Sequence, residues 1–472
     1  MQKTKMIFTI GPASDKEDII RKFINIGMSA ARLNFSHGDH ETHKEKIDLI
    51  KKVRKELNTP TAIILDIKGP KIRTHKFEND GVELFEGNKF IFSCSDEILG
   101  NAEKCSLSYK ELYMDVNVGG DILVDDGTLK FKIENIIDKD IHCTVTVGGL
   151  IKNNKGVNVP NVKIHLPSIT EKDKIDLKFG CENNVDFVAA SFIRKASDVM
   201  DVRNILDKNG GKYIQIISKI ENQEGVDNID SILEVSDGIM VARGDMGVEI
   251  PIEKVPIIQK KIIRKCNEAG KIVITATQML DSMIRNSIPT RAEACDISNA
   301  IFDGTDAIML SGESASGLYP IEAAKTMSNI AIETEANLDY IYLNKRLKEP
   351  ALTSFSEAIS YSACRSSNLL DAKVIVAATN SGTTAKLISK YRPKCPIIAI
   401  TPHVEIMRGL NLNFGLFPIQ CDTFTTTDQI LVEAKKVATN LSFAKKGDDI
   451  IIVSGIPNAE TGGTNMLKID KI

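Results

Sequence analysis

Eight short apolar segments, each followed by a polar turn and a helical pattern, restrict the fold of this chain more than any other feature. They read KMIFTIG, SAARLNFS, TAIILDI, DFVAASF, YIQIISKIE, DGIMVARGD, KIVITAT and DAIMLSGES. Continuous apolar runs are typical of parallel strands buried on both faces. Ser, Thr, Asp or Pro often begins the intervening segments, as helix capping requires. We therefore expect helices at 15–26, 40–57, 170–179, 196–208, 224–235, 252–269, 290–302 and 320–336.

Eight β–α units are the number that closes a TIM barrel, whereas an open doubly wound sheet is the alternative architecture for the same pattern. Polar residues able to do chemistry follow nearly all eight apolar segments. Barrel active sites are built at the C-terminal ends of the strands, which favours the barrel. The sequence predicts an α/β fold in which residues 1–70 and 167–340 form a TIM (β/α)8 barrel.

One β–α unit is interrupted by an insertion. The helix expected after TAIILDIKGP is missing until SITEKDKIDL, and residues 71–166 alternate instead with a period of two. Turn signals at NDG, DDG and GG separate short segments such as LKFKIENI and IHCTVTV, which read as antiparallel strands. We predict an inserted small β-barrel domain at the mouth of the larger barrel, where it can act as a lid.

A smaller α/β domain is expected after the barrel, in residues 341–472. Its strands read KVIVAAT, PIIAIT, FPIQ and DIIIVSG, and the strand-like segment NMLKI follows them. The charged segment YLNKRLKEP, just before this domain, reads as a helix end or a linker.

Composition excludes several classes of protein. Hydrophobic residues make up 42% and charged residues 26% of the chain, as in globular proteins with a real core. The net charge of −3 gives no reason to expect nucleic acid or an anionic membrane as a partner. Nine single cysteines without a CxxC pair argue against a disulfide framework and a structural zinc site. Without a signal-peptide pattern or a membrane-spanning apolar run, we expect a cytoplasmic protein.

The segment SKIE is the strongest chemical signal. Lys219 and Glu221 are two residues apart on a strand, so both side chains point to the same face. The next strand ends in ARGD and brings Asp245 beside Glu221. Two carboxylates without His or Cys suit Mg²⁺, which takes substrate oxygens and water as its other ligands. The alternative is that Lys219–Glu221 or Arg243–Asp245 ion pairs merely fill the barrel.

Other strand ends carry groups suited to anions. Arg32, at the end of the second strand, can grip phosphate oxygens in bidentate fashion, and Arg73 lies at the base of the lid. Gly244 lets backbone N–H groups approach an anion at a helix start. Thr277 brings a hydroxyl to another strand end, although a single buried Thr is more often structural.

A second set of polar residues is open to two interpretations. Asn34, Ser36 and Asp66 offer neutral or anionic oxygens, which suit either a monovalent cation or plain hydrogen-bond satisfaction. Three histidines at i, i+3 and i+6 follow, namely His37, His40 and His43. Their spacing turns too far around a helix for one metal site, so we interpret them as solvated residues at a helix start.

The C-terminal domain contains a turn rich in hydroxyl groups before the helix AKLISKY. A helix N-terminus with such a turn is a phosphate cradle by geometry, and a second glycine-rich loop, SGIPNAETGGTN, could close over it. A plain surface loop is the alternative. The residues of the turn are Thr379, Asn380, Ser381, Gly382, Thr383 and Thr384.

Six motifs, taken in order, resemble the pyruvate kinase family: ARLNFSHG, LDIKGPKIRT, SKIEN, VARGDMGVEIP, TATQMLDSM and MLSGESASGLYP. The resemblance covers the whole chain, including the insertion and the C-terminal domain. It implies transfer of a phosphoryl group from phosphoenolpyruvate to ADP, giving pyruvate and ATP. It also implies Mg²⁺, for which Mn²⁺ can substitute, a homotetramer, and a phosphorylated allosteric effector.

The resemblance assigns roles to individual residues. Catalysis falls to Lys219, Arg32 and Thr277, and the divalent metal to Glu221 and Asp245. Arg32 and Lys219 meet the substrate phosphate, and Gly244, Asp245 and Thr277 meet its carboxylate. The nucleotide contacts carry over to Asn34, Ser36, His37, Arg73 and Lys155. The potassium site of the family matches Asn34, Ser36, Asp66 and the carbonyl group of Ile67.

Two departures from the family pattern bear on ion dependence and regulation. Many potassium-dependent members carry Glu where this chain has Lys71, so we hypothesise that Lys71 supplies the positive charge and that potassium is not required. Thr383 replaces a basic residue that some members carry in the effector loop. Fructose bisphosphate, a sugar monophosphate and AMP therefore all remain open as effectors.

Two other functions fit parts of the pattern. A barrel aldolase would use Lys219 as a Schiff base, but Glu221 on the same face opposes the lowered lysine pKa that this chemistry needs. A catalytically inactive sensor of phosphorylated metabolites would have lost at least one of Lys219, Glu221, Asp245 and Arg32, and all four are present. Both alternatives are disfavoured.

Overall fold

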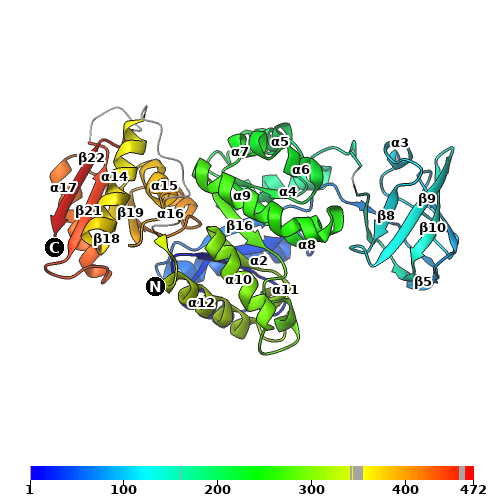
Figure 1. The fold of residues 1–472 in the computed structure, drawn as a ribbon, viewed down its shortest axis with the longest axis horizontal. Coiled ribbons are helices and arrows are strands. Elements are labelled where there is room, and N and C mark those ends of the chain that lie inside the picture. Colours follow the sequence, from blue (N-terminus) through cyan, green and yellow to red (C-terminus); the bar gives the residue numbers. More distant parts are fainter. Residues whose placement is uncertain (1, 161, 341–342, 344–353, 457–462) are drawn as a thin grey trace.

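The computed structural model describes residues 2–160, 162–340, 343, 354–456 and 463–472. Three bodies lie in a row along the long axis (Figure 1). The barrel occupies the middle, the inserted domain lies at one end and the C-terminal domain at the other. The predicted boundary at residues 340 and 341 adjoins a segment outside the described residues, and so does most of YLNKRLKEP.

Eight parallel strands form a closed barrel in the order β1-β17-β16-β15-β14-β13-β3-β2. This confirms the barrel and rules out the open sheet. Each of the eight predicted segments supplies one strand. Their bounds are β1 Lys5–Thr9, β2 Met28–Asn34, β3 Ala62–Asp66, β13 Phe187–Ala190, β14 Gln215–Ile220, β15 Gly238–Ala242, β16 Ile272–Ala276 and β17 Ala307–Leu310.

Helices cover the outside of the barrel, and seven of the eight predicted helices begin and end within three residues of the predicted positions. The helix predicted at 224–235 is instead divided into two, Gln223–Asp227 and Ile229–Val235. Side-chain caps explain several starts: the hydroxyl of Thr170 accepts from the Asp173 N–H, and that of Thr290 from the Glu293 N–H. The helices are α1 Glu17–Ile26, α2 His40–Glu56, α4 Glu171–Glu182, α5 Ala196–Lys208, α6 Gln223–Asp227, α7 Ile229–Val235, α9 Val255–Ala269, α10 Arg291–Asp303 and α12 Pro320–Ala336.

Two short helices at the barrel mouth were not predicted. They are α8, Arg243–Glu249, and α11, Gly312–Ala315, and each begins directly after a strand or one residue later. Both are shorter than the two turns needed for a visible apolar periodicity. The first of them carries Gly244 and Asp245.

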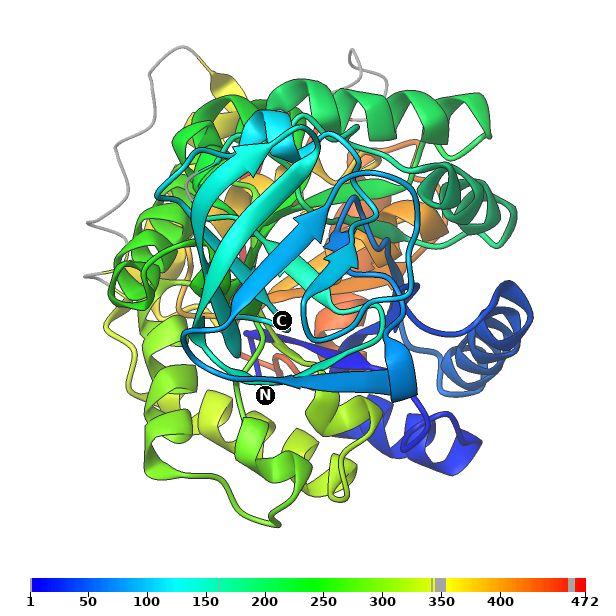
Figure 2. The same ribbon diagram turned by 90° about the vertical axis from the view of Figure 1, so that its right-hand side faces the viewer.

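The insertion forms its own β domain over the mouth of the barrel (Figure 2). A seven-stranded sheet has the order β4-β12-β8-β9-β10-β6-β7, and a Thr74–Leu107 bridge joins its two edges, as expected for a small barrel. The strands of the domain are β4 Ile72–Arg73, β5 Gly81–Leu84, β6 Lys89–Ser93, β7 Lys104–Ser106, β8 Asp121–Val124, β9 Leu129–Ile137, β10 Asp140–Val147, β11 Gly149–Lys152 and β12 Gly156–Asn158, with a short helix α3 at Leu112–Asp115. Of these, β5 and β11 pair in a separate two-stranded sheet. A separate core that includes Phe90, Phe92 and Phe131 holds this domain together.

The C-terminal domain is a five-stranded sheet in the order β20-β19-β18-β21-β22, with only the last strand antiparallel. The five predicted strand segments are confirmed. They are β18 Val374–Ala378, β19 Ile397–Thr401, β20 Leu416–Gln420, β21 Asp449–Ser454 and β22 Met466–Lys471. The accompanying helices are α14 Phe355–Leu370, α15 Thr383–Lys390, α16 Val404–Leu410 and α17 Thr427–Asn440.

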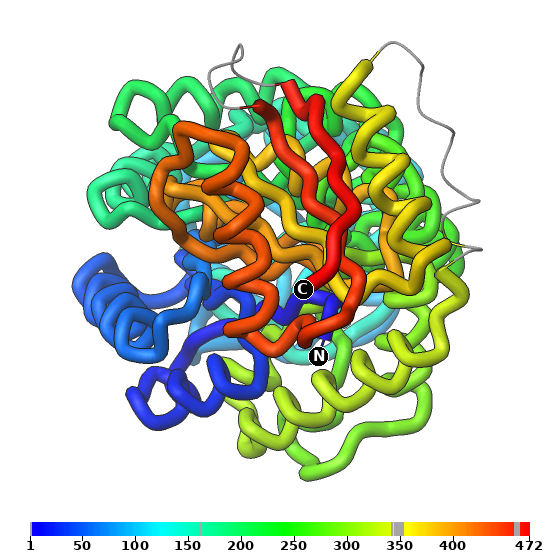
Figure 3. The backbone as a smooth tube through the Cα atoms, turned by 90° about the vertical axis from the view of Figure 1, so that its left-hand side faces the viewer, coloured from blue at the N-terminus to red at the C-terminus, as the bar shows by residue number. Residues whose placement is uncertain are grey.

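The C-terminal domain closes the bottom of the barrel, the end opposite the insertion (Figure 3). Leu412 is fully buried in the same apolar cluster as Ile64, Ile217 and Met309 from the barrel strands. Asn411 donates to the carbonyl groups of Ser29 and Pro60 at 2.8 and 3.0 Å. The C-terminal domain therefore covers the end of the barrel opposite the insertion. No helix in the described part of the chain is long and apolar enough to cross a bilayer.

Candidate active site

Lys219 is the centre of a buried polar network at the barrel mouth. It lies near the end of β14, and its Nζ is 3.2 Å from Asp66 Oδ1, 3.0 Å from Glu221 Oε1 and 2.6 Å from Ser191 Oγ. These partners come from the ends of three different strands. All three N–H groups of the ammonium therefore have an acceptor.

Arg32 joins the same network through Asp66. Its Nε donates to Asp66 Oδ2 at 2.7 Å, and its Nη1 donates to the hydroxyl of Thr9 at 3.0 Å. Asp66 thus lies between the two cations that are expected to meet the substrate phosphate. One carboxylate holds Arg32 and Lys219 side by side.

The charges of this network stabilise one another. Burial raises the pKa of Asp66, but Arg32 and Lys219 outweigh burial, and the pKa lies below its usual value. Burial lowers the pKa of Lys219, but Asp66 and Glu221 outweigh it, and the pKa is raised. A lysine held in its charged form cannot serve as a Schiff-base nucleophile. The network therefore argues against the aldolase.

Glu221 and Asp245 are the candidate metal ligands. Burial raises the pKa of Glu221, and the nearby charge of Asp245 raises it further against the opposing effect of Lys219. A divalent cation would relieve this repulsion, and two carboxylates with substrate oxygens and water fit Mg²⁺. Within the described residues no cluster of three or more His, Cys, Asp or Glu side chains suits a metal.

Thr277 and Gly244 lie together at the ends of β16 and β15. The Gly244 N–H donates to the Thr277 hydroxyl at 2.8 Å, and that hydroxyl donates to the Ala276 carbonyl at 2.6 Å. Thr277 has a φ of 69°, which is uncommon for a β-branched residue and typical of functional sites. Arg243 pairs with Asp296 at 2.6 Å, so the Arg243–Asp245 pair considered from the sequence does not form.

The residues expected at the potassium site gather at the ends of β2 and β3. Asn34 is in register with Asp66, and the Asn34 amide oxygen accepts from the Ser36 N–H at 3.0 Å. The carbonyl group of Ile67 accepts from the Ser191 hydroxyl at 2.7 Å. The Asn34 amide oxygen and the Ile67 carbonyl oxygen therefore already have hydrogen-bond partners within the protein.

The remaining nucleotide contacts belong to the lid. Arg73 lies on β4 and donates to the carbonyl group of Asn154 at 2.8 Å, and Lys155 pairs with Asp125 at 2.8 Å. Neither residue has a hydrogen bond or ion pair with Asn34, Ser36 or His37 in the described part of the chain. Of the expected nucleotide contacts, some therefore lie on the barrel and the others on the inserted domain, and the two groups do not contact each other among the described residues.

Lys71 connects the lid to the candidate metal site. Its Nζ is 3.2 Å from Asp126 of the lid and 3.3 Å from Asp245 of α8. Burial lowers the pKa of Lys71, but the two carboxylates outweigh it, and the pKa is raised. Gly156 makes room for this side chain, because a Cβ there would lie 2.6 Å from the Lys71 Cε.

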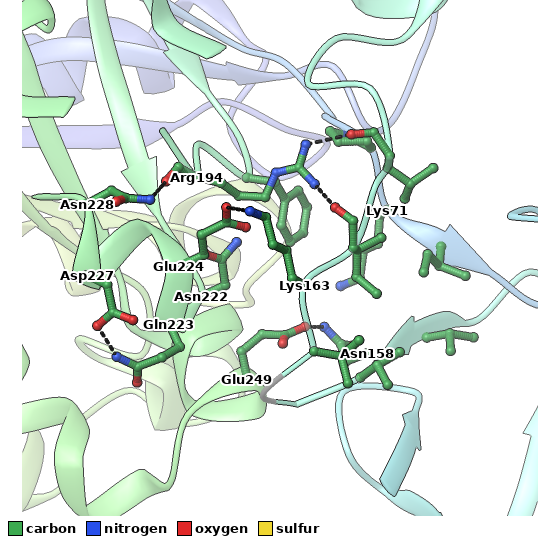
Figure 4. Close-up of a pocket in the computed structure, with 18 residues that line it drawn as sticks. Lys71, Asn158, Lys163, Arg194, Asn222, Gln223, Glu224, Asp227, Asn228 and Glu249 are labelled. Atoms are coloured by element: carbon green, nitrogen blue, oxygen red, sulfur yellow. Dashed lines mark hydrogen bonds and ion pairs between the residues drawn. The ribbon is translucent and has the colours of Figure 1, made fainter. Parts of the chain in front are cut away.

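A cleft of about 490 Å³ lies beside Lys71, between the lid linkers and the barrel (Figure 4). Asn158 on β12 donates to Glu249 at the end of α8 at 2.6 Å, and Arg194 donates to the carbonyl group of Leu166 in the linker at 2.6 Å. Burial raises the pKa of Glu249. These contacts hold the lid linkers against the barrel.

The interpretation of the three histidines as solvated residues is wrong for one of them. His43 is buried, stacks on Phe35 at 3.9 Å between ring centroids, and bonds the carbonyl group of His37 through Nε2. His40 bonds Asp176 at 2.7 Å. His37 is exposed. Aromatic packing against Phe35, which cannot be read from the spacing, draws His43 inward.

The hydroxyl-rich turn of the C-terminal domain leads directly into α15. The Gly382 N–H donates to the Thr379 hydroxyl at 2.9 Å, and Gly382 has a φ of 87°. Thr384 bonds Thr464 at 2.7 Å, so one end of the second glycine-rich loop reaches the first. Residues 457–462 of that second loop lie outside the described residues.

Sequence reasoning missed three contributions to the mouth. Ser191 and the Phe192 N–H hold Lys219 and Glu221, and the Thr9 hydroxyl holds Arg32. Ser191 and Thr9 stand at or just after a strand end, in VAASF and FTIG. Their place at a strand end could have identified them as candidates, but single hydroxyl residues are too common at strand ends to be distinguished by position.

Comparisons with known proteins agree with this geometry. The family described as "Pyruvate kinase, barrel domain" matches residues 1–324, and "Pyruvate kinase, alpha/beta domain" matches residues 357–470. Pyruvate kinases of Clostridium perfringens (strain 13 / Type A) and Clostridium acetobutylicum are 66% and 56% identical to this chain, and each alignment covers 100% of both chains.

A solved structure has the same architecture. The crystal structure of a pyruvate kinase from Cryptosporidium parvum matches with a TM-score of 0.94 and 41% identity, covering 100% of this chain and 96% of that one. The chain therefore belongs to the pyruvate kinase family, and its reaction is the transfer of the phosphoryl group of phosphoenolpyruvate to ADP, giving pyruvate and ATP.

Proposed function

We propose that Lys219 and Arg32, held together on Asp66, carry the phosphoryl transfer. A loose phosphoryl-transfer transition state needs positioning and countercharge more than covalent help. The observation that best supports this role is the Lys219 ammonium with three acceptors at 2.6–3.2 Å, beside an arginine on the same carboxylate. Both cations meet the phosphate of phosphoenolpyruvate and neutralise the moving group.

Lys219 also holds the negative oxygen of the enolate that remains after transfer. Burial lowers the pKa of Lys219, but Asp66 and Glu221 outweigh it and raise the pKa, which favours the charged ammonium. Gly244, Asp245 and Thr277 meet the substrate carboxylate. Thr277 then delivers a proton to the enolate carbon through water, and the position of its hydroxyl beside the Gly244 N–H at the barrel mouth supports this role.

Glu221 and Asp245 hold Mg²⁺, and Mn²⁺ can substitute. Burial raises the pKa of Glu221 and the nearby charge of Asp245 raises it further, which supports this pairing. The metal, when bound, supplies countercharge to substrate oxygens. Asn34, Ser36, His37, Arg73 and Lys155 contact the nucleotide. Closure of the inserted domain excludes water that would otherwise hydrolyse the phosphoryl group.

Lys71 makes the enzyme independent of potassium. Its ammonium lies on Asp245 at 3.3 Å, so a fixed positive charge is already present at the mouth. Asn34, Ser36, Asp66 and the Ile67 carbonyl group match the potassium site of the family. Activity is compared in buffers with and without potassium. Loss of activity that only potassium restores would contradict the proposal.

Regulation is assigned to the C-terminal domain. A phosphorylated effector binds the turn from Thr379 to Thr384, at the start of α15, where backbone N–H groups and hydroxyls converge. The enzyme works as a homotetramer in the cytoplasm. Fructose bisphosphate, a sugar monophosphate and AMP are tested in turn, with Thr384→Val as the variant that should lose the response.

The first test is ATP formation from phosphoenolpyruvate and ADP with magnesium. The parent is compared with Lys219→Met and with Lys265→Met, a lysine paired with Asp230 on the outside of the barrel. We expect kcat to collapse in Lys219→Met and not in Lys265→Met, because Lys219 belongs to the polar network at the mouth and Lys265 does not. A folded Lys219→Met enzyme with the kcat of the parent would contradict the assigned role.

A further inference from the structure

Ser191 makes the shortest contact to the candidate catalytic lysine. It follows β13 directly, is 3% exposed, and its Oγ lies 2.6 Å from Lys219 Nζ. The same Oγ is 2.7 Å from the carbonyl oxygen of Ile67 and 3.4 Å from Asp66 Oδ1. A hydroxyl has one hydrogen, and the distances direct it to Ile67. Its lone pairs are then free to accept from Lys219.

The hydroxyl differs in kind from the other two partners of Lys219. Asp66 is shared with Arg32, and Glu221 is a candidate metal ligand. A metal competes for the oxygens of these carboxylates, and a substrate phosphate competes for the cations that they hold, whereas a neutral hydroxyl anchored on a backbone carbonyl keeps its position. Ser191 is therefore the one partner of the ammonium whose bond does not depend on the charge state of the site.

The turn that carries Ser191 is held rigidly on two sides. Phe192 has a φ of 56°, and its N–H donates to Glu221 Oε2 at 2.6 Å. A Cβ on Gly69 would lie 2.9 Å from the Ser191 Cβ, and a Cβ on Gly225 would lie 2.7 Å from the Ile193 carbonyl oxygen. Glycines at both places let the neighbouring backbones close on this turn.

We propose that Ser191 is a positioning residue for the phosphoryl transfer: its hydroxyl, fixed on the Ile67 carbonyl group, sets the position of the Lys219 ammonium. The Phe192 N–H on the same turn orients Glu221, so one turn sets the spacing of the ammonium and the carboxylate. The inference rests on the proposed role of Lys219. A displacement of about 1 Å in a catalytic group can cost about a hundredfold in rate.

The test uses Ser191→Ala and Ser191→Cys in the full-length enzyme. Cysteine keeps the size of the side chain but exchanges a strong acceptor for a weak one, so it carries the test even where alanine prevents folding. We expect kcat to fall by about tenfold to a hundredfold, with the KM for phosphoenolpyruvate within about threefold of the parent. The matched control is Ser218→Ala: Ser218 is also fully buried on the barrel, but its hydroxyl bonds Ser236 at 2.7 Å instead of a lysine. It should keep the kcat of the parent.

Two readouts separate positioning from a structural role. Mn²⁺ binding, titrated without substrate, should stay within about threefold of the parent in the Ser191 variants, because Glu221 keeps the Phe192 N–H. In a Lys219→Met background, Ser191→Ala should change the residual rate less than about twofold, since the group it positions is gone. A multiplicative further loss, or a parallel loss of Mn²⁺ affinity, would overturn the proposal.

The outcomes also separate this inference from the proposed function. If Lys219→Met kept the kcat of the parent, both the proposed role of Lys219 and the inference about Ser191 would be contradicted. Loss of kcat in Lys219→Met together with unchanged kcat in both Ser191 variants would overturn the positioning role alone.

Discussion

Acidic side chains stand at both ends of the barrel, and they have different partners. At the bottom, Asp186, Asp237 and Asp306 immediately precede β13, β15 and β17. Each accepts from the backbone N–H of the neighbouring strand, at Ile63, Ile216 and Val273, at 2.8, 2.8 and 2.9 Å. At the N-terminal ends of the strands, an aspartate before every second strand thus accepts a hydrogen bond from the neighbouring strand and links the two.

At the mouth, the acidic side chains mainly contact other charged side chains. Asp66 contacts Arg32 and Lys219, and Asp245 contacts Lys71. Glu221 combines one backbone N–H with Lys219. Side-chain cations can exchange a carboxylate for a substrate phosphate, whereas backbone donors in a sheet cannot move. The bottom is therefore built for stability and the mouth for exchange of partners.

The C-terminal domain strengthens this contrast because it adds fixed cations to the bottom. Arg392 pairs with Asp306 at 2.9 Å, and Arg408 approaches Asp186 at 3.9 Å. The Phe414 N–H donates to Asp306 at 3.1 Å. Five substitutions test this difference between the two ends.

The largest effect is expected at the mouth, for Glu221→Gln. We expect kcat to fall at least about a thousandfold, because the variant loses a candidate metal ligand. The free energy of unfolding should change little, since burial and Asp245 already disfavour the charge and raise the pKa of Glu221. Steady-state kinetics and urea unfolding measure both.

Glu313→Gln is the matched control for that change. Glu313 is as buried as Glu221, but its carboxylate accepts from backbone N–H groups, including those of Leu280 and Ser311, and has no ion pair among the described residues. It should keep kcat within about tenfold of the parent. Equal loss of activity in both variants would remove the distinction between exchangeable and fixed carboxylates.

At the bottom, Asp306→Ala should lower the free energy of unfolding by about 3 kcal/mol. The substitution leaves the buried Arg392 without its carboxylate partner, and it removes the acceptor for the Val273 and Phe414 N–H groups. The kcat of the remaining folded enzyme should stay within about twofold. A folded variant of unchanged stability but reduced kcat would reverse the assignment of the two ends.

Lys5 provides a pH test of the bottom. Burial lowers its pKa to about 8, and its ammonium lies 4.6 Å from the Phe417 ring. Between pH 8 and 10.5 the unfolded chain binds more protons than the folded one, so the free energy of unfolding rises with pH. The parent should gain about 2 kcal/mol between pH 7 and 10 relative to Lys5→Met. Parallel pH profiles of the two proteins would contradict this.

The smallest effect is expected for Asp237→Ala. Asp237 makes the same bond to a strand N–H as Asp306, but its side chain is 36% exposed and its ion pair with Arg203 is long, at 3.5 Å. Loss of about 1 kcal/mol in urea unfolding is expected. A loss as large as that of Asp306→Ala would show that the stability comes from the bond between the aspartate and the strand N–H, and not from the ion pair with Arg392 of the C-terminal domain.

Much of the fold could be predicted from residue patterns. All eight barrel strands and the surrounding helices follow from local periodicity and capping, as the Thr170 and Thr290 caps illustrate. Of the candidate site, the sequence predicted that Lys219 and Glu221 share one face, from their spacing, and that Arg32 stands at a strand end, and the structure places all three at the barrel mouth. The burial of His43 against Phe35 was missed, because no local pattern reports a ring that approaches from a neighbouring element.

By itself the sequence determined the barrel, the insertion, the C-terminal domain and the family, since each depends on patterns within a few tens of residues. The tertiary structure decided which atoms meet at the two ends. Lys219 meets Asp66 from 153 positions away, and Leu412 closes a barrel made of residues before 311. Such contacts depend on the closure and stagger of eight strands, which no single segment encodes.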